Sequence, residues 1–257
     1  MPTYRLVVEY DGSAFHGLQY QPALRTVAGA LEDALARLFQ LPVKIAAAGR
    51  TDAGVHATGQ VVSFAAERAF PIDRLALAIN ANTPPDIVVR HAAVVPDGFS
   101  ARFDARERVY EYLVQNRGFP SALWRARAWH VARPIDDERL LTAAEPLVGE
   151  HDFVSFCGEQ PTHGGTVRDL RAIDVARRGD LVRVSLRGNG FLHHMVRVVV
   201  GTLVECATGY RDVEFARLAL EARSRSAAGA TAPAHGLYLA GVRYDDFDSY
   251  RAVDIAP

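Results

Sequence analysis

The sequence has 257 residues, 49% of them hydrophobic, and a formal net charge of −1. This length suits one large domain or two ordinary ones, and no apolar run approaches the ~20 residues that span a bilayer. Two cysteines exclude a disulfide framework and a cysteine-rich metal site, and the N-terminus has no leader-like pattern. We therefore expect a cytoplasmic protein with no membrane association.

Positive charge is clustered, and nearly all of it is arginine. Residues 101–133 contain seven arginines and three acidic residues. Residues 165–200 also contain seven arginines and three acidic residues, so each segment carries a net charge of +4. Lys44 is the only lysine. Guanidinium groups grip phosphates and stack on bases, which favours an RNA partner. A general composition bias toward arginine explains the same counts, so charge alone leaves both interpretations open.

Hydrophobic periodicity predicts the elements of the first half of the chain. Thr26 is a typical helix cap, and an apolar stripe follows it. In chain order the predicted elements are a strand at 4–10, a turn at 11–13, a helix running from the Thr26 cap through Gln40, strands at 43–47 and 60–64, a helix at 71–80 and a strand at 87–95.

The pattern loosens over residues 96–105, so we place a domain boundary there and expect domains at 1–105 and 106–257. The second half predicts strands at 109–114, 167–175, 181–186 and 238–244, and helices at 136–148, 191–207 and 213–223. Gly209 ends the 191–207 helix and Asp212 caps the next. Hairpins outnumber βαβ crossovers. The order of elements therefore indicates an α+β fold of two α/β subdomains, with mainly antiparallel sheets and helices on one face.

A loop of unusual chemistry separates the predicted strands 43–47 and 60–64. Its centre reads Gly49-Arg50-Thr51-Asp52-Ala53-Gly54-Val55-His56, which puts Asp52 at the tip of a hairpin. Asp and Gly are common in ordinary turns. Alternatively, Arg50 faces the same side and holds Asp52 ionised, because such a pair at ~4 Å and a dielectric near 20 is worth roughly 4 kcal/mol before desolvation. An oriented carboxylate suits nucleophilic or electrostatic work at a sugar carbon.

This loop closely resembles the signature of the tRNA pseudouridine synthase A (TruA) family. Other segments resemble the same family in the same order, so the resemblance covers nearly the whole chain. They are 10–17 (YDGSAFHG), 26–29 (TVAG), 99–103 (FSARF), 108–112 (RVYEY), 149–153 (GEHDF), 188–197 (GNGFLHHMVR) and 232–237 (APAHGL). The chain departs from the family at Leu18, where Trp is frequent, and at Ala28, where Gln is frequent.

The resemblance implies an enzyme that isomerises uridine to pseudouridine at positions 38–40 of the tRNA anticodon stem–loop. It implies Asp52 as catalytic nucleophile, Tyr110 and Arg50 as substrate-binding residues, and Arg197 and Asn189 as residues lining the site. It further implies a homodimer, an extended pseudouridine-synthase-like sheet, the catalytic loop in domain 1–105 and an active-site cleft between the halves. The departures at Leu18 and Tyr20, in the segment 17–21 (GLQYQ), leave the alternative of a non-catalytic RNA-binding protein of the same fold. A second alternative is a hydrolase that uses Asp52 with the histidines and a metal.

No cofactor or metal is expected. The reaction moves atoms without redox change, and the sequence has no dinucleotide or P-loop fingerprint. His193 and His194, with His151 and His163, raise the question of a metal. However, adjacent residues of a helix point ~100° apart, and the His-Glu-x-x-His spacing is absent. Gly188-Asn189-Gly190, expected to open a helix, either presents amides to a phosphate or makes a tight turn.

Overall fold

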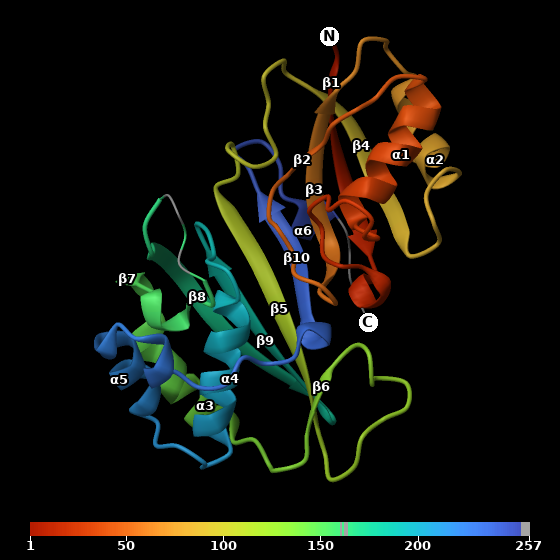
Figure 1. Cartoon of the computed structure of the whole chain (residues 1–257). Coiled ribbons are helices and arrows are strands. Elements are labelled where there is room, and N and C mark those ends of the chain that lie inside the picture. The colour runs from red at the N-terminus through yellow and green to blue at the C-terminus, as the bar shows by residue number, and fades with distance from the viewer. Residues whose placement is uncertain (160, 162–163, 253–257) are drawn as a thin grey trace. The chain divides into compact units, whose positions relative to one another are not determined.

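The computed structural model describes residues 1–159, 161 and 164–252, which form two compact units (Figure 1). The first unit comprises Met1–Arg108 and the chain from Tyr238 onward, and the second comprises Val109–Leu237. The first division thus falls three residues after the predicted boundary at 105. The last strand, which the sequence placed with the C-terminal domain, belongs to the first unit.

The first unit is built on a sheet with strand order β4-β1-β3-β10. Its strands are β1 (Thr3–Tyr10), β3 (His56–Ala65), β4 (Ile87–Val95) and β10 (Leu237–Arg243), with the short β2 (Ala46–Ala47) paired to β3. β1 is antiparallel to both of its neighbours. β10 lies parallel to β3, with Tyr238 opposite His56, and this pairing brings a strand from the end of the chain into the N-terminal unit.

Two helices cover one face of this sheet, α1 (Val27–Phe39) and α2 (Ile72–Asn80) (Figure 1). The Thr26 hydroxyl accepts the Gly29 amide hydrogen at 3.2 Å and begins α1, as predicted. Leu31 and Leu35 of α1 and Leu75 and Ile79 of α2 are buried, so both helices contribute their apolar stripes to the core.

The residues after β10 pack on the opposite side of β1. Tyr4 stacks with Phe64 in the aromatic core under α1, so the neighbouring Arg5 faces the other way. The Phe247 ring lies 3.8 Å from the Arg5 guanidinium carbon, and Asp246 forms an ion pair with Arg5 at 3.2 Å. The helix α6 (Ser249–Ala252) follows. The end of the described chain therefore completes the first unit.

The second unit has a sheet with strand order β5-β9-β8-β7, in which β8 is antiparallel to β9 and to β7. Its strands are β5 (Glu107–Asn116), β7 (Gly149–Asp152), β8 (Val167–Arg178) and β9 (Leu181–Gly188), and the short β6 (Trp129–Val131) pairs with β5. β6 and β7 were not predicted from the sequence. Three or four residues are too few for alternation to be recognised.

Helices α3 (Asp137–Ala144), α4 (Met195–Ala207) and α5 (Phe215–Ala222) pack together in the second unit. α3 was predicted to reach residue 148, but Pro146 lies in a 3-10 turn that replaces its last residues. α4 begins four residues later than predicted, because His194 has a φ of +58° and cannot be helical. Short 3-10 segments are η1 (Gly12–Ala14), η2 (Glu145–Leu147), η3 (Val154–Phe156), η4 (Arg225–Ala227) and η5 (Ala234–Gly236).

The cap of α5 also differs from the prediction. Glu214, not Asp212, is the N-cap residue. Asp212 lies two residues earlier, and its carboxylate accepts the Glu214 amide hydrogen at 3.1 Å. The predicted fold class, α+β with mainly antiparallel strands, is confirmed. Across the part of the chain that the structure describes, the helices are all too short or too polar to cross a membrane.

Candidate active site

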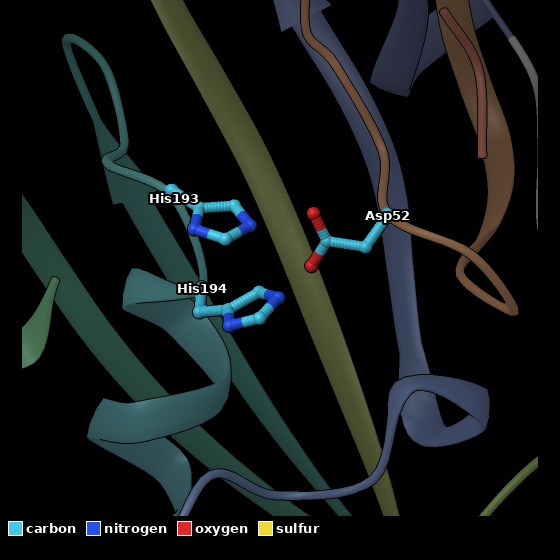
Figure 2. Close-up of side chains that lie close together, drawn as sticks. All are labelled: Asp52, His193 and His194. Atoms are coloured by element: carbon cyan, nitrogen blue, oxygen red, sulfur yellow. The ribbon is translucent and has the colours of Figure 1, made fainter. Parts of the chain in front are cut away.

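Residues 48–55 connect β2 to β3, and Asp52 lies in the middle of this loop (Figure 2). The two strands are antiparallel, with Ala47 opposite Val62, so the predicted hairpin is confirmed. β3 begins at His56, four residues before the predicted start, which makes the signature histidine a strand residue. Asp52 is half-buried, whereas the preceding Thr51 is buried.

Two buried side chains hold the loop from beneath. The Tyr10 hydroxyl and the Thr51 hydroxyl are hydrogen-bonded at 2.7 Å, and the Gln60 Nε2 donates to the Gly49 carbonyl at 2.8 Å. Burial raises the pKa of Tyr10 to about 12, so its phenol stays neutral near neutral pH. These bonds anchor the residues on both sides of Arg50.

Backbone contacts hold the loop from the side. The Leu18 amide donates to the Thr51 carbonyl at 3.0 Å, and the Val55 amide donates to the Asp52 carbonyl at 3.1 Å. Gly17 has a φ of +89°, and a Cβ there would lie 2.8 Å from the Thr51 oxygen, so the close approach requires glycine. The backbone on both sides of the Asp52 carboxylate is therefore fixed.

His56 fastens the start of β3 to the turn after β1. Its Nδ1 accepts the Gly12 amide hydrogen at 3.0 Å and lies 3.2 Å from an Asp11 carboxylate oxygen. The buried imidazole stacks on Tyr238 of β10 with ring centroids 4.7 Å apart. Because Nδ1 accepts from Gly12, the geometry assigns the ring proton of a neutral His56 to Nε2.

Arg50 is exposed, and among the described residues its guanidinium makes no ion pair with the Asp52 carboxylate. The predicted pairing of these two side chains is thus not seen. The hydrogen bonds of the surrounding backbone fix the position of the Asp52 main chain.

In the second unit, Tyr110 is a buried residue of β5, and its ring packs edge-on against Phe191 with centroids 5.0 Å apart. Arg197 lies in the first turn of α4 and donates from Nε to the Ala232 carbonyl at 2.8 Å. Burial raises the pKa of Tyr112, and the charge of Arg197 offsets part of that rise. Tyr110 and Tyr112 face the same side of β5. The structure therefore places Tyr110 against Phe191, and the charge of Arg197 acts on Tyr112, two residues further along β5.

Asn189 follows β9 and is exposed. The backbone amide of Asn189 donates to the Asp169 carbonyl, and the Asn189 side-chain oxygen accepts the backbone amide hydrogen of Asp169, both at 3.0 Å. Asn189 thus extends the pairing of β8 with β9. Since α4 starts at Met195, the Gly188-Asn189-Gly190 turn does not open the helix, and that prediction was wrong.

The two adjacent histidines precede α4 and stack on each other, with ring centroids 3.8 Å apart (Figure 2). The prediction that they diverge by ~100° assumed a helix that is not present at these positions. His151 contacts the Val148 carbonyl at 3.1 Å. His163 lies outside the described residues.

The model of the family described as tRNA pseudouridine synthase matches residues 6–104 and 143–245, which include the Asp52 loop and the start of α4. The chain belongs to this family. It is an isomerase family, and the resemblance seen in the sequence motifs is confirmed.

Proteins called tRNA pseudouridine synthase A are similar to this synthase along nearly its full length. The one from Methylobacterium sp. (strain 4-46) is 46% identical and covers 96% of this chain and 99% of its own. The protein from Halalkalibacterium halodurans is 45% identical and covers 90% of this chain and 89% of its own. A chain in the structure titled "Crystal Structure of a Cbf5-Nop10-Gar1 Complex" has a TM-score of 0.32 and 11% identity over 78% of this chain and 53% of its own, and this likeness carries no argument.

Sequence reasoning missed the residues that support the loop of the synthase. Tyr10 and Gln60 were each assigned to a strand and given no further role, yet both hold the Asp52 loop from inside the core. One signal was present, because Gln60 is a polar residue in the apolar strand segment Gln60-Val61-Val62. A buried polar side chain needs a partner, and here the partner is the loop.

Proposed function

We propose that the enzyme converts uridine to pseudouridine at positions 38–40 of the tRNA anticodon stem–loop, with Asp52 as the nucleophile. The observation that carries this proposal is the Asp52 loop itself. A half-buried carboxylate stands on a backbone that Leu18, Val55 and the Tyr10–Thr51 hydrogen bond hold in place. Such preorganisation suits attack on a sugar carbon that must be met in one geometry.

The reaction breaks the bond between uracil N1 and ribose C1′ and forms a bond between C5 and C1′. The proton on C5 leaves to water, and N1 takes up a proton, so no electrons are gained or lost overall. Asp52 attacks C1′ or stabilises the positive charge that develops there. The uridine must leave its stack before Asp52 can reach the sugar, at a cost of a few kcal/mol.

Other residues take supporting roles in the proposal. Tyr110 contacts the uracil base, and Arg50, exposed beside Asp52, binds a phosphate that flanks the reacting nucleotide. Arg197 and Asn189 contact the substrate near the start of α4. We further propose that the enzyme acts as a homodimer in the cytoplasm, where tRNA is modified, and that it uses neither cofactor nor metal.

Replacing Asp52 by Asn tests the assignment. The variant removes the nucleophilic charge while keeping size and shape, so release of tritium from C5-labelled uridine in tRNA should fall by about 10³-fold or more. Affinity for the tRNA should stay within a few fold. Asp97→Asn, at an exposed aspartate in a turn of the same unit, is the matched control and should react like the wild type.

Normal turnover by Asp52→Asn would contradict the nucleophile assignment. The alternative, a non-catalytic RNA-binding protein, requires that the wild-type chain bind tRNA and release no tritium. Mapping the pseudouridines formed in a purified transcript decides the positions: modification outside 38–40 would contradict the proposed substrate site.

A further inference from the structure

The loop that connects β5 to β6, residues 117–128, carries large apolar side chains into solvent. Phe119 is 68% exposed and Leu123 is 86% exposed. Four arginines and no aspartate or glutamate occur between Tyr112 and Ile135, and they are Arg117, Arg125, Arg127 and Arg133. Exposed aromatic side chains among cations are typical of surfaces that bind single-stranded nucleic acid.

The loop is held in a defined shape. Arg117 lies over the Phe119 ring at 5.0 Å, donates to the Phe119 carbonyl at 2.9 Å, and forms an ion pair with Asp180 at 3.5 Å. The Ser121 amide donates to Gln115 Oε1 at 3.0 Å, and Arg125 donates to the Ala122 carbonyl at 3.0 Å. Phe119 is therefore presented to solvent by a structured loop, which lowers the entropic cost of binding a partner.

We propose that the 117–128 loop is an RNA-binding surface, on which an unpaired base stacks on Phe119 and phosphates contact Arg125 and Arg127. The proposal rests on the proposed function, because it takes tRNA as the RNA. The loop lies between the two segments that match the family model, 6–104 and 143–245. The match to the family model therefore gives the loop no role.

Charge favours RNA over a second copy of this chain as the occupant. In an isologous contact centred on the loop, each copy would bring the same four arginines to the interface without acidic residues from this segment. Like charges facing each other oppose association, whereas phosphates neutralise them.

A second aromatic–arginine pair in the same unit provides a control. Tyr210 is 64% exposed, and the Arg211 guanidinium lies 5.2 Å from its ring, so the geometry matches that of Phe119 with Arg117. Each arginine has an acidic partner, since Arg117 pairs with Asp180 at 3.5 Å and Arg211 with Glu205 at 3.6 Å. The two segments differ in sequence, because Asp212 and Glu214 follow Tyr210, whereas no acidic residue occurs between Tyr112 and Ile135. The surroundings of Tyr210 should repel phosphates.

The test compares the affinities of full-length variants for an unmodified tRNA transcript. Phe119→Ala should weaken binding roughly 5- to 150-fold, which corresponds to the loss of one stacked base. Arg125→Ala should reduce the slope of log affinity against log salt concentration by the amount expected for the loss of about one phosphate contact. Tyr210→Ala should bind within twofold of the wild type.

Affinities of Phe119→Ala and Arg125→Ala equal to that of Tyr210→Ala would overturn the proposal. So would a change of oligomeric state in Phe119→Ala by gel filtration, since it would mark the loop as a contact between copies. These binding measurements need no turnover. If the wild type binds tRNA but releases no tritium, the proposed catalysis fails while the loop is still tested.

Discussion

Asp52 illustrates how one side chain is oriented by residues far from it in sequence. The neighbouring Thr51 is buried and bonded to Tyr10 of β1, and the Gly49 carbonyl is bonded to Gln60 of β3. A carboxylate whose backbone is fixed on both sides loses little conformational entropy when it meets a substrate. This explains how the loop can keep Asp52 half-buried and still oriented without an ion pair to Arg50.

The buried Tyr10 phenol should make stability depend on pH in alkaline solution. Burial raises the pKa of Tyr10 from 10.0 to about 12, so above pH 10 the unfolded chain releases this proton more readily than the folded chain. The contribution of Tyr10 to stability is therefore fully present below pH 10 and is lost as the pH rises toward 12. Two pKa units correspond to roughly 2–3 kcal/mol.

Tyr10→Phe tests this effect, because phenylalanine keeps the ring and has no proton to lose. The free energies of unfolding of wild type and variant are measured with denaturant from pH 8 to 11.5. As the pH rises, the wild type should lose stability relative to the variant. A difference that stays constant over this range would show that the Tyr10 phenol is not protected by the fold.

At the scale of elements, the starts of α3 and α5 show which of two capping aspartates sets the first residue of its helix. Asp136 accepts the amide hydrogens of both Glu138 and Arg139, at 2.9 and 3.1 Å, and α3 begins directly after it. Among the described residues, the Asp212 carboxylate accepts one backbone amide hydrogen, that of Glu214, and α5 begins later. The sequence pattern predicts a cap at Asp212 and places Asp136 within its helix, so it assigns the capping role to the aspartate that makes fewer cap bonds.

The difference in bonding predicts a difference in stability. Asp136→Ala should lower the free energy of unfolding by about 1 kcal/mol, the usual cost of losing an N-cap, and Asp136→Asn should restore most of it. Asp212→Ala is the matched control and should cost clearly less. Equal losses in the two alanine variants, measured by urea unfolding, would show that the two aspartates do the same work.

At the scale of the whole molecule, the end of the described chain is part of the N-terminal unit. The buried Ser249 hydroxyl donates to the Gly59 carbonyl and accepts the Val242 amide hydrogen, both at 2.8 Å. It thus ties α6 to β3 and β10, although Gly59 and Ser249 lie 190 residues apart. Few sequence signals report a contact across so long a separation.

Ser249→Ala should destabilise the first unit selectively. Two buried backbone groups lose their partner, at a cost of about 1–3 kcal/mol. Hydrogen exchange followed by mass spectrometry should become faster in β1 and β3 and stay unchanged in β8 and β9. Ser226→Ala, at an exposed serine of the second unit, should change neither. Faster exchange in β8 and β9 alone would contradict this role of the C-terminal segment.

The sequence by itself determined most helices and strands, the hairpin that carries Asp52 and, through its motifs, the family, because these depend on local periodicity, caps and short spacings. Only the tertiary structure decided that His56 belongs to β3, that α4 begins at Met195, and that β10 belongs to the first unit. It also decided that Tyr10 and Gln60 support the loop. These features arise from pairing and burial between segments distant in the chain, which local patterns do not encode.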